Sequence, residues 1–195
     1  AQAGMLARLF EHSMGLGPEW RVEDVWFESP ASGDEELHVR VGRVPGAAVA
    51  CPECGARCGV YDARERTWRH LDIWQFRTVV HCRVPRADCP EHGPRTVRMP
   101  WEVRPSSHFT ALFEAQVLMM AMSGMTVRAV SLQVRESDSR IWAMLGRAVA
   151  EAREGADYSG VTRVGIDDTA RARGQRYISV MADVDGRRVV AVTEG

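Results

Sequence analysis

Two short segments with the same layout constrain this chain more than any other feature. Cys51-Pro52-Glu53-Cys54-Gly55 places two thiols two residues apart, and Cys89-Pro90-Glu91-His92-Gly93 places a thiol and an imidazole at the same spacing. Two ligand pairs of this kind supply the four soft ligands of a tetrahedral zinc ion, and the glycines allow the positive φ of a tight turn. The sequence therefore predicts a zinc ribbon, in which Cys51, Cys54, Cys89 and His92 hold a structural zinc with no open coordination position.

The remaining cysteines and histidines leave alternatives. The odd number of cysteines, with a CxxC and no secretory signal, indicates metal binding before disulfides. Cys82 lies in an apolar stretch, where a buried thiol is typical. Cys58 is too close to Cys54 for easy closure around the same ion, yet either Cys58 or Cys82 could replace a proposed ligand. His70 and His81 lack partners at ligand spacing, so we interpret them as surface or core histidines.

Charge and hydropathy narrow the class of protein. The 25 basic and 26 acidic side chains give a net charge of −1, which does not fit a simple basic nucleic-acid binder. Every basic residue is arginine, whose planar fork suits phosphate and guanine edges, although a GC-rich coding sequence would give the same composition. No apolar run is long enough to span a membrane, and residues 1–5 do not begin a secretory signal. We expect a cytoplasmic protein that does not interact with membranes.

The hydrophobic period changes several times and predicts an α+β, multi-domain fold. Residues 6–16 have helical spacing and end at a Gly-Pro stop signal. The segments expected to be extended are 22–28, 37–44 and 68–84, and 100–105 is interpreted as a linker. We therefore expect an N-terminal helix with strands over 1–48 and a zinc-binding, ribbon-like module over 49–104.

Helical spacing dominates residues 105–156. One helix is expected from Ser107, as N-cap, to Gly124, a short one follows Thr126, and a third begins at Ser137 or Asp138. This succession fits a helix-turn-helix, although a generic helical bundle would give the same pattern. In a helix-turn-helix the first residues of the last helix meet base edges in the major groove. The residues predicted to contact DNA are therefore Ser137, Asp138, Ser139 and Arg140.

Residues 157–195 return to extended structure. Strands are expected over 163–167, 177–184 and 188–193, with a hairpin at Asp185-Gly186 joining the last two. Asp167 and Asp168 end the first of these strands. Taken alone, they would be a solvated strand end or a helix cap.

Taken together, these segments resemble insertion-sequence transposases of the ISL3 type. Besides the two cysteine segments, the resemblance lies in Trp68-Arg69-His70-Leu71-Asp72, Val84-Pro85-Arg86-Ala87-Asp88, Val97-Arg98-Met99-Pro100-Trp101, Phe109-Thr110-Ala111-Leu112-Phe113-Glu114, Val164-Gly165-Ile166-Asp167-Asp168-Thr169, Arg173-Gly174-Gln175-Arg176-Tyr177 and 189–195. It implies a zinc finger, a helix-turn-helix that recognises the terminal inverted repeats of the element, and the first strands of a DDE catalytic domain with a ribonuclease H-like fold.

The resemblance also implies a catalytic residue, and the chain differs from many relatives at two positions. Asp167 matches the first catalytic carboxylate, followed here by Asp168 where relatives commonly have Glu, and Tyr61 stands where many relatives have His. Such an enzyme uses two divalent cations, Mg²⁺ in a complete parent enzyme, held by three carboxylates. The second Asp and the Glu are absent from this chain. We therefore expect a truncated product, an isolated domain or a degraded element that alone neither cleaves nor joins DNA.

Three functions remain open at this point. The leading hypothesis is binding of double-stranded DNA at terminal inverted repeats, as the recognition part of a transposase in DNA transposition. The second is a zinc-dependent protein-interaction module, which could include self-association and which the near-neutral charge favours. The third is a transcription regulator derived from a transposase. A zinc hydrolase is disfavoured because the predicted ligand set leaves no position for water.

Overall fold

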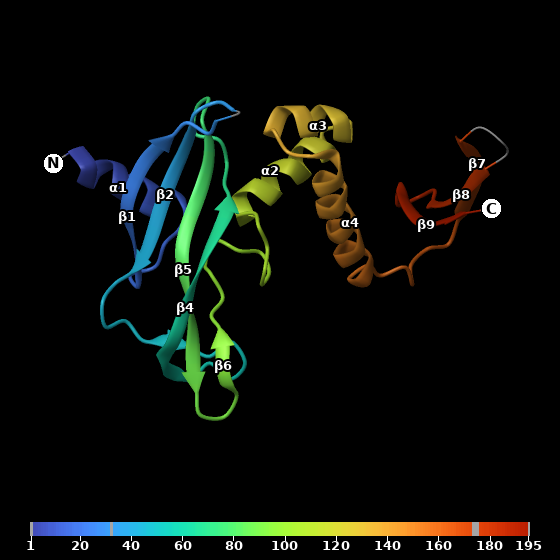
Figure 1. Cartoon of the computed structure of the whole chain (residues 1–195). Coiled ribbons are helices and arrows are strands. Elements are labelled where there is room, and N and C mark those ends of the chain that lie inside the picture. Colours follow the sequence, from blue (N-terminus) through green and yellow to red (C-terminus); the bar gives the residue numbers. More distant parts are fainter. Residues whose placement is uncertain (1, 32, 173–175, 195) are drawn as a thin grey trace. The chain divides into compact units, whose positions relative to one another are not determined.

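The computed structural model describes residues 2–31, 33–172 and 176–194 (Figure 1). Residues 173–175, part of the segment Arg173–Tyr177 quoted above, lie outside this description. The chain forms two compact units, Ala1–Leu145 and Gly146–Gly195. Among the described helices, none has the length and apolar character needed to cross a bilayer.

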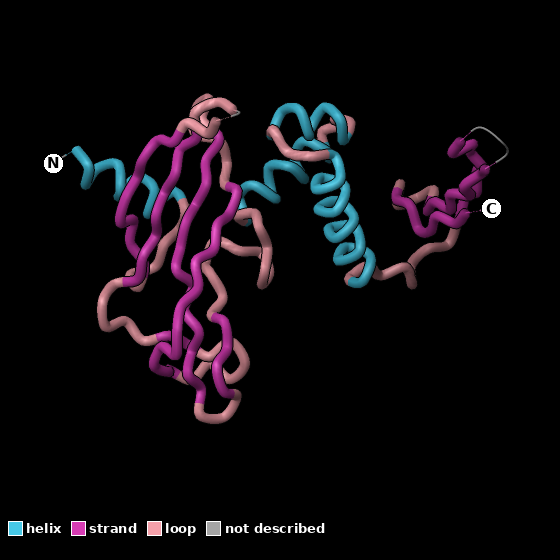
Figure 2. Tube along the Cα trace, viewed as in Figure 1, coloured by secondary structure: helices cyan, strands magenta, loops and turns pink. Residues whose placement is uncertain are grey.

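The first unit contains a six-stranded sheet preceded by one helix (Figures 1 and 2). Its elements are α1 (Gln2–Ser13), β1 (Trp20–Glu28), β2 (Glu36–Arg43), β3 (Val49–Ala50), β4 (Arg57–Arg69), β5 (Arg77–Cys89) and β6 (Gly93–Thr96). The strand order is β1-β2-β5-β4-β3, and β6 pairs with β5 beyond the end of β2. Only the β2–β5 pair is parallel; the other pairs are antiparallel.

One hydrophobic core contains residues from both 1–48 and 49–104, which the sequence pattern assigns to separate modules. Strand alternation places Val39 of β2 and Val80 of β5 opposite one another, both fully buried. Trp68 of β4 pairs with Val80 and is also fully buried, and Phe10 of α1 belongs to the same cluster. Burying a side chain of this size stabilises the fold by about 1.5–3 kcal/mol. The segments 1–48 and 49–104 on either side of the predicted boundary therefore share a sheet and a core.

The predicted linker at 100–105 is also part of this core. Trp101 is 3% exposed and packs edge-on against Trp20 and Trp68, with ring centroids 5.6 and 5.3 Å away. The Nε1 of Trp68 donates a hydrogen bond of 2.8 Å to Glu102. The prolines that suggest a linker thus flank an anchored turn, and the interpretation of 100–105 as a linker is wrong.

The central hairpin is longer than the predicted extended stretch. β4 and β5 each contain 13 residues, and the predicted segment 68–84 covers the last two residues of β4, the connecting loop and the first part of β5. Most of β4 lacks the apolar alternation of a half-buried strand, because Val60 and Tyr61 are exposed and charged residues follow them. For this reason the sequence pattern misses most of the strand.

Three helices follow the sheet: α2 (Ala111–Met122), α3 (Val127–Val134) and α4 (Asp138–Glu154). The predicted N-cap Ser107 is wrong, because Thr110 accepts the backbone N–H of Phe113 at 3.4 Å and caps α2. Ser107 is instead buried and donates its hydroxyl to Glu114 at 2.8 Å. The short helix expected after Thr126 is α3, and Thr126 caps it by accepting the N–H of Ala129 at 3.2 Å. The side chains that form the helical core are Phe109, Phe113, Val117, Val130, Val134, Ile141 and Met144.

The second unit contains the antiparallel sheet β7-β8-β9, made of β7 (Val164–Ala172), β8 (Arg176–Asp183) and β9 (Arg188–Glu194). The hairpin between β8 and β9 lies where the sequence predicts it. The Asp183 carboxylate accepts the N–H groups of Asp185 and Gly186 at 3.2 and 3.0 Å. The left-handed residue of this turn is Arg187, with φ 50°, and not the expected glycine.

Candidate metal centre and helix-turn-helix

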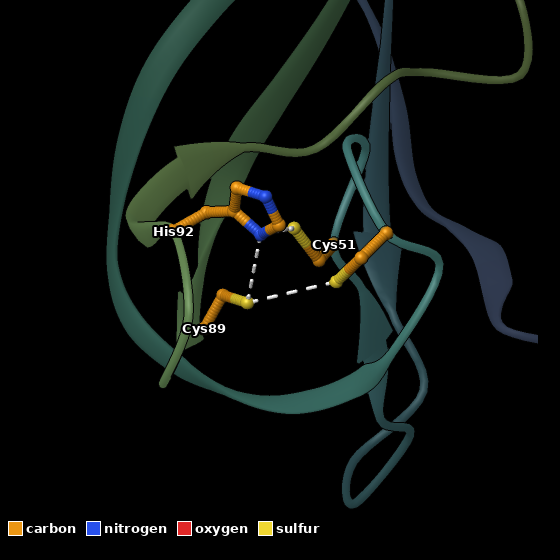
Figure 3. Close-up of side chains that lie close together, drawn as sticks. Cys51, Cys89 and His92 are labelled. Atoms are coloured by element: carbon orange, nitrogen blue, oxygen red, sulfur yellow. Dashed lines mark hydrogen bonds between the residues drawn. The ribbon is translucent and has the colours of Figure 1, made fainter.

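The four predicted zinc ligands meet at one point. The sulfurs of Cys51, Cys54 and Cys89 and a ring nitrogen of His92 all lie within 4.8 Å of one another. The Cys54 and Cys89 sulfurs are 3.8 Å apart, and Nδ1 of His92 is 3.6 Å from the Cys89 sulfur and 3.9 Å from that of Cys51. Figure 3 shows the side chains of Cys51, Cys89 and His92 pointing toward one another.

These distances fit a tetrahedral zinc ion. Zn–S and Zn–N bonds of about 2.3 and 2.0 Å imply ligand separations of about 3.8 Å for two sulfurs and about 3.6 Å for sulfur and nitrogen. The observed separations differ from these values by at most a few tenths of an ångström. Three thiols and one imidazole fill all four positions, so a bound zinc would cross-link the two segments without acting as a catalyst.

The same backbone arrangement presents each pair of ligands. Gly55 and Gly93, one residue after Cys54 and His92, both have positive φ, at 73° and 66°. The N–H of Gly55 donates to the carbonyl of Cys51 at 2.9 Å, and Gly93 pairs with Cys89 at the junction of β5 and β6. A Cβ would be strained at these φ values, which explains why glycine follows both ligand pairs.

The surroundings of the sulfurs shift the pKa values of Cys89 and Cys54 in opposite directions. The backbone N–H of His92 lowers the pKa of the Cys89 thiol, and this effect outweighs burial, which raises it. The backbone N–H of Ala56 acts in the same direction on Cys54, but burial and the neighbouring sulfurs of Cys51 and Cys89 raise the pKa of Cys54 overall. Several thiolates this close repel one another, and a divalent cation would remove that penalty.

Neither competing cysteine belongs to the group of four converging ligands, although Cys58 packs in the same buried cluster as Cys51 and Cys89. Cys58 pairs with Val49 across β3 and β4, and its sulfur lies 3.3 Å from the carbonyl of Ala56. Cys82 is 1% exposed in the sheet core, where burial raises the pKa of its thiol to about 12. A thiol with such a high pKa behaves as a small apolar side chain.

The two extra histidines have roles that the sequence did not reveal. His70 is 3% exposed and its Nδ1 lies 2.8 Å from the hydroxyl of Thr110, the cap of α2. Burial lowers the pKa of His70 to about 4. His81 forms a 2.8 Å hydrogen bond with His38 on the adjacent strand. This pair depends on the parallel β2–β5 register, which spacing along the chain does not show.

The helices α3 and α4 have the geometry of a helix-turn-helix. Three residues, 135–137, connect them, and Arg135 ends α3 in the left-handed region with φ 54°. Val134 of α3 and Ile141 of α4 are buried together in the helical core. A connection of three to four residues between two packed helices is typical of this motif.

The four predicted DNA-contacting residues lie at the beginning of α4. Ser137 and Ser139 are exposed, with their hydroxyl oxygens 3.1 Å apart. Asp138 pairs with Arg128 of α3 at 3.5 Å. Arg140 donates to the buried carboxylate of Glu136 at 2.7 Å, so its guanidinium is partly engaged within the protein.

Two further side chains near this surface were missed by the sequence reading. Trp142 of α4 is 63% exposed, although aromatic side chains at helical spacing usually belong to a core. It follows Ser139 by three residues, and both lie away from the buried residues Ile141 and Met144. The side chain of Arg128, at the beginning of α3, is 70% exposed. An exposed tryptophan could have been recognised only after the buried face of α4 was known.

Asp167 lies in the middle of β7, where it pairs with Val180 of β8 and is exposed. The structure therefore does not place it at the end of the strand, because β7 continues to Ala172. The neighbouring Asp168 accepts the Ser179 hydroxyl at 2.5 Å. Among the described side chains of this unit, none pairs with the carboxylate of Asp167.

Comparisons with known proteins agree with both sites. The zinc finger of transposase IS204/IS1001/IS1096/IS1165 matches residues 47–92, and the helix-turn-helix domain of transposase family ISL3 matches residues 97–149. The transposase for insertion sequence element IS1557 of Mycobacterium tuberculosis is 30% identical over 192 residues, covering 96% of this chain and 43% of the relative. The transposase for insertion sequence element IS1001 of Bordetella parapertussis is 30% identical over 195 residues, covering 98% and 46%. The chain thus spans less than half the length of these relatives, and no solved structure matches it.

Proposed function

The chain carries the zinc ribbon and the helix-turn-helix domain of ISL3-family transposases, and from this we propose that it recognises the terminal inverted repeats of an insertion element. The observation that carries the proposal is the α3–α4 motif, whose second helix begins with exposed polar residues and an exposed tryptophan. A recognition helix presents such residues to base edges in the major groove. The zinc would act by cross-linking the sheet that supports this motif.

We assign specific roles to the exposed side chains. Ser137, Ser139 and Arg140 would read base edges, while Asp138 would orient Arg128. Trp142 offers an apolar surface that suits a thymine methyl group or the sugar backbone. Arg128 would contact a phosphate, which fixes the position of the protein on the duplex but carries no sequence information.

Fluorescence anisotropy with a duplex of the terminal repeat and a scrambled duplex tests this proposal. We expect a clear preference for the repeat and an affinity that falls steeply with salt, because each neutralised phosphate releases counterions. Trp142→Ala should reduce the preference, whereas Arg128→Ala should weaken binding to both duplexes and lower the salt slope by about one. Tyr61→Ala, which removes a 57% exposed aromatic side chain from β4, is the matched control. Equal affinity of the wild-type protein for the two duplexes would refute the proposal.

The sheet of the second unit would be the beginning of a ribonuclease H-like DDE domain. Asp167 would supply the first carboxylate of a Mg²⁺ site in a complete enzyme. Exposed apolar side chains support this proposal: Ile166 is 67% exposed and Val192 51% exposed, as expected for a sheet that packs on further elements. In a complete enzyme that contains these residues, Asp167→Asn should abolish Mg²⁺-dependent nicking of a repeat-containing plasmid. Nicking retained by this variant would refute the assignment.

Self-association is a second candidate function. Met119 and Met122 of α2 are 69% and 87% exposed, and Leu132 of α3 is 62% exposed. Exposed apolar side chains of this size often mark protein–protein contacts. Light scattering coupled to size-exclusion chromatography, with and without duplex, distinguishes the two functions, because this one requires oligomers in the absence of DNA.

A further inference from the structure

The segment Trp68–Asp72 connects the zinc-bearing sheet to the helix-turn-helix. Trp68, the second-last residue of β4, lies in the sheet core, whereas Leu71 packs against the helical core. His70 contacts the N-cap of α2. The two charged residues of the segment, Arg69 and Asp72, contact the turn between α3 and α4.

Arg69 holds the end of α3. Its side chain is 3% exposed, and its Nη2 donates to the carbonyl of Val134, the last residue of α3, at 3.1 Å. The same guanidinium lies over the ring of Phe113 of α2, 5.0 Å from its centroid, and pairs with Asp72. Since the terminal carbonyls of a helix have no partner within the helix, a cation at this end satisfies them and favours the helix dipole.

Asp72 holds the turn itself. Its Oδ2 accepts Nη2 and Nε of Arg135 at 2.6 and 3.2 Å, while its Oδ1 pairs with Arg69. Arg135 also donates to the carbonyl of Gln75 in the β4–β5 loop at 3.0 Å. Arg135 is the left-handed residue of the turn. The conformation that sets the angle between α3 and α4 is therefore anchored from the sheet by a pair of charge-assisted hydrogen bonds.

Glu136, in the turn before α4, connects the first turn of that helix to β5, the second strand of the hairpin. Its side chain is 3% exposed and accepts Arg77, the first residue of β5, at 3.1 Å and Arg140 of α4 at 2.7 Å. Arg77 also pairs with Glu36 of β2 at 2.6 Å. Both strands of the hairpin thus have the proposed zinc site at one end and this network at the other. β4 ends at Arg69 of the network, whereas β5 begins at Arg77 of the network and ends at the ligand Cys89.

We propose that Arg69, Asp72 and Glu136 are positioning residues that fix the helix-turn-helix on the zinc-bearing sheet, so that both domains meet DNA as one rigid body. The inference rests on the proposed recognition of terminal repeats. Buried charges are costly unless each is well paired, and separating the domains would leave Arg69 with Asp72 alone and Glu136 with Arg140 alone. A rigid body presents α4 to the groove in one orientation, and no binding free energy is spent on ordering the two domains.

The direct test compares Asp72→Asn with Asp34→Asn. Asp72→Asn keeps the shape of the side chain but removes the charge shared by Arg69 and Arg135. Asp34 faces the same Arg135 at 4.0 Å with a side chain that is 91% exposed, which makes its variant a matched control. We expect Asp72→Asn to weaken binding to the terminal repeat by about 2- to 30-fold, with unchanged zinc content and unchanged binding to scrambled duplex. Asp34→Asn should bind like wild type.

Hydrogen exchange of the protein without DNA gives an independent readout. In Asp72→Asn the amides of 135–140 should exchange faster than in wild type, while those of the β4–β5 ladder stay protected. If Asp72→Asn does not fold, Arg135→Gln removes the same contact from the helical side and leaves the Arg69–Asp72 pair in place. It should give the same faster exchange and the same loss of affinity.

The outcomes separate the inference from the function on which it rests. Wild-type protein without preference for the repeat would refute the proposed function, and the exchange experiment would still test the rigid connection. Specific binding by the wild type, with affinity and exchange unchanged in Asp72→Asn and Arg135→Gln, would overturn the inference alone. A double variant whose loss of affinity equals that of either single variant would support it, because the two residues would then act as one contact.

Discussion

At the scale of single residues, the spacing along the chain predicts the four zinc ligands, but it does not decide whether a nearby cysteine such as Cys58 replaces one of them. The two CPxC-like segments define Cys51, Cys54, Cys89 and His92, and the structure brings the four together. Cys58 has the same chemistry, and only the pairing of β3 with β4 shows that its sulfur is directed to the carbonyl of Ala56. Metal geometry thus depends on a tertiary contact that local sequence does not encode.

The first prediction separates the two kinds of cysteine. Cys54→Ala should abolish stoichiometric zinc binding, because three ligands remain, whereas Cys58→Ala should retain one zinc per chain. Mass spectrometry of native protein after chelator-free purification measures both. Loss of zinc in Cys58→Ala together with retention in Cys54→Ala would reverse our assignment.

The second prediction concerns the pH dependence caused by His70. The unfolded chain takes up a proton at this side chain near pH 6.5, but the folded protein does so only near the lowered pKa of about 4. The folded state therefore loses stability as the pH falls from 6.5 toward 4, by on the order of 3 kcal/mol. His70→Asn keeps a side chain that can form a hydrogen bond with Thr110 but does not titrate. Urea denaturation should show a shallower pH dependence for the variant, and identical slopes would contradict the assignment.

At the scale of elements, hydrophobic period predicts the helices better than the sheet. The α3 helix, the start of α4 and the last two strands of the second unit lie close to where the pattern places them, whereas β7 continues five residues beyond the predicted strand end at 167. The N-cap of α2 does not, since Ser107 and Thr110 are both good capping residues. Ser107 is engaged with Phe109 and Glu114, whereas Thr110 caps the helix beside the buried His70.

The third prediction uses this difference between caps. Thr126→Ala at the exposed start of α3 should destabilise the protein by about 1 kcal/mol, the usual cost of losing an N-cap. Thr110→Ala should cost roughly 2–3 kcal/mol, because it also leaves the buried Nδ1 of His70 without its hydroxyl partner. Chemical denaturation at pH 7 measures both values. Equal losses would show that the contact with His70 contributes little.

At the scale of the whole molecule, the parallel pairing of β2 with β5 was not predictable from the chain. It joins residues about forty positions apart and places Val39 opposite Val80. Nothing in the local pattern selects β5 over another partner, so the sequence suggested separate modules at 1–48 and 49–104. As a result, the ligand-bearing hairpin, the N-terminal strands and the helix-turn-helix up to Leu145 of α4 belong to one unit.

A zinc-dependent DNA titration tests the central claim that the metal-bearing sheet and the helix-turn-helix act together. Anisotropy would be recorded with repeat and scrambled duplexes for zinc-loaded protein, for protein after chelation, and after zinc is restored. Because structural zinc contributes folding free energy directly, we predict a preference for the repeat that disappears on chelation and returns with zinc. Preference that persists at full strength in zinc-free protein would contradict the account.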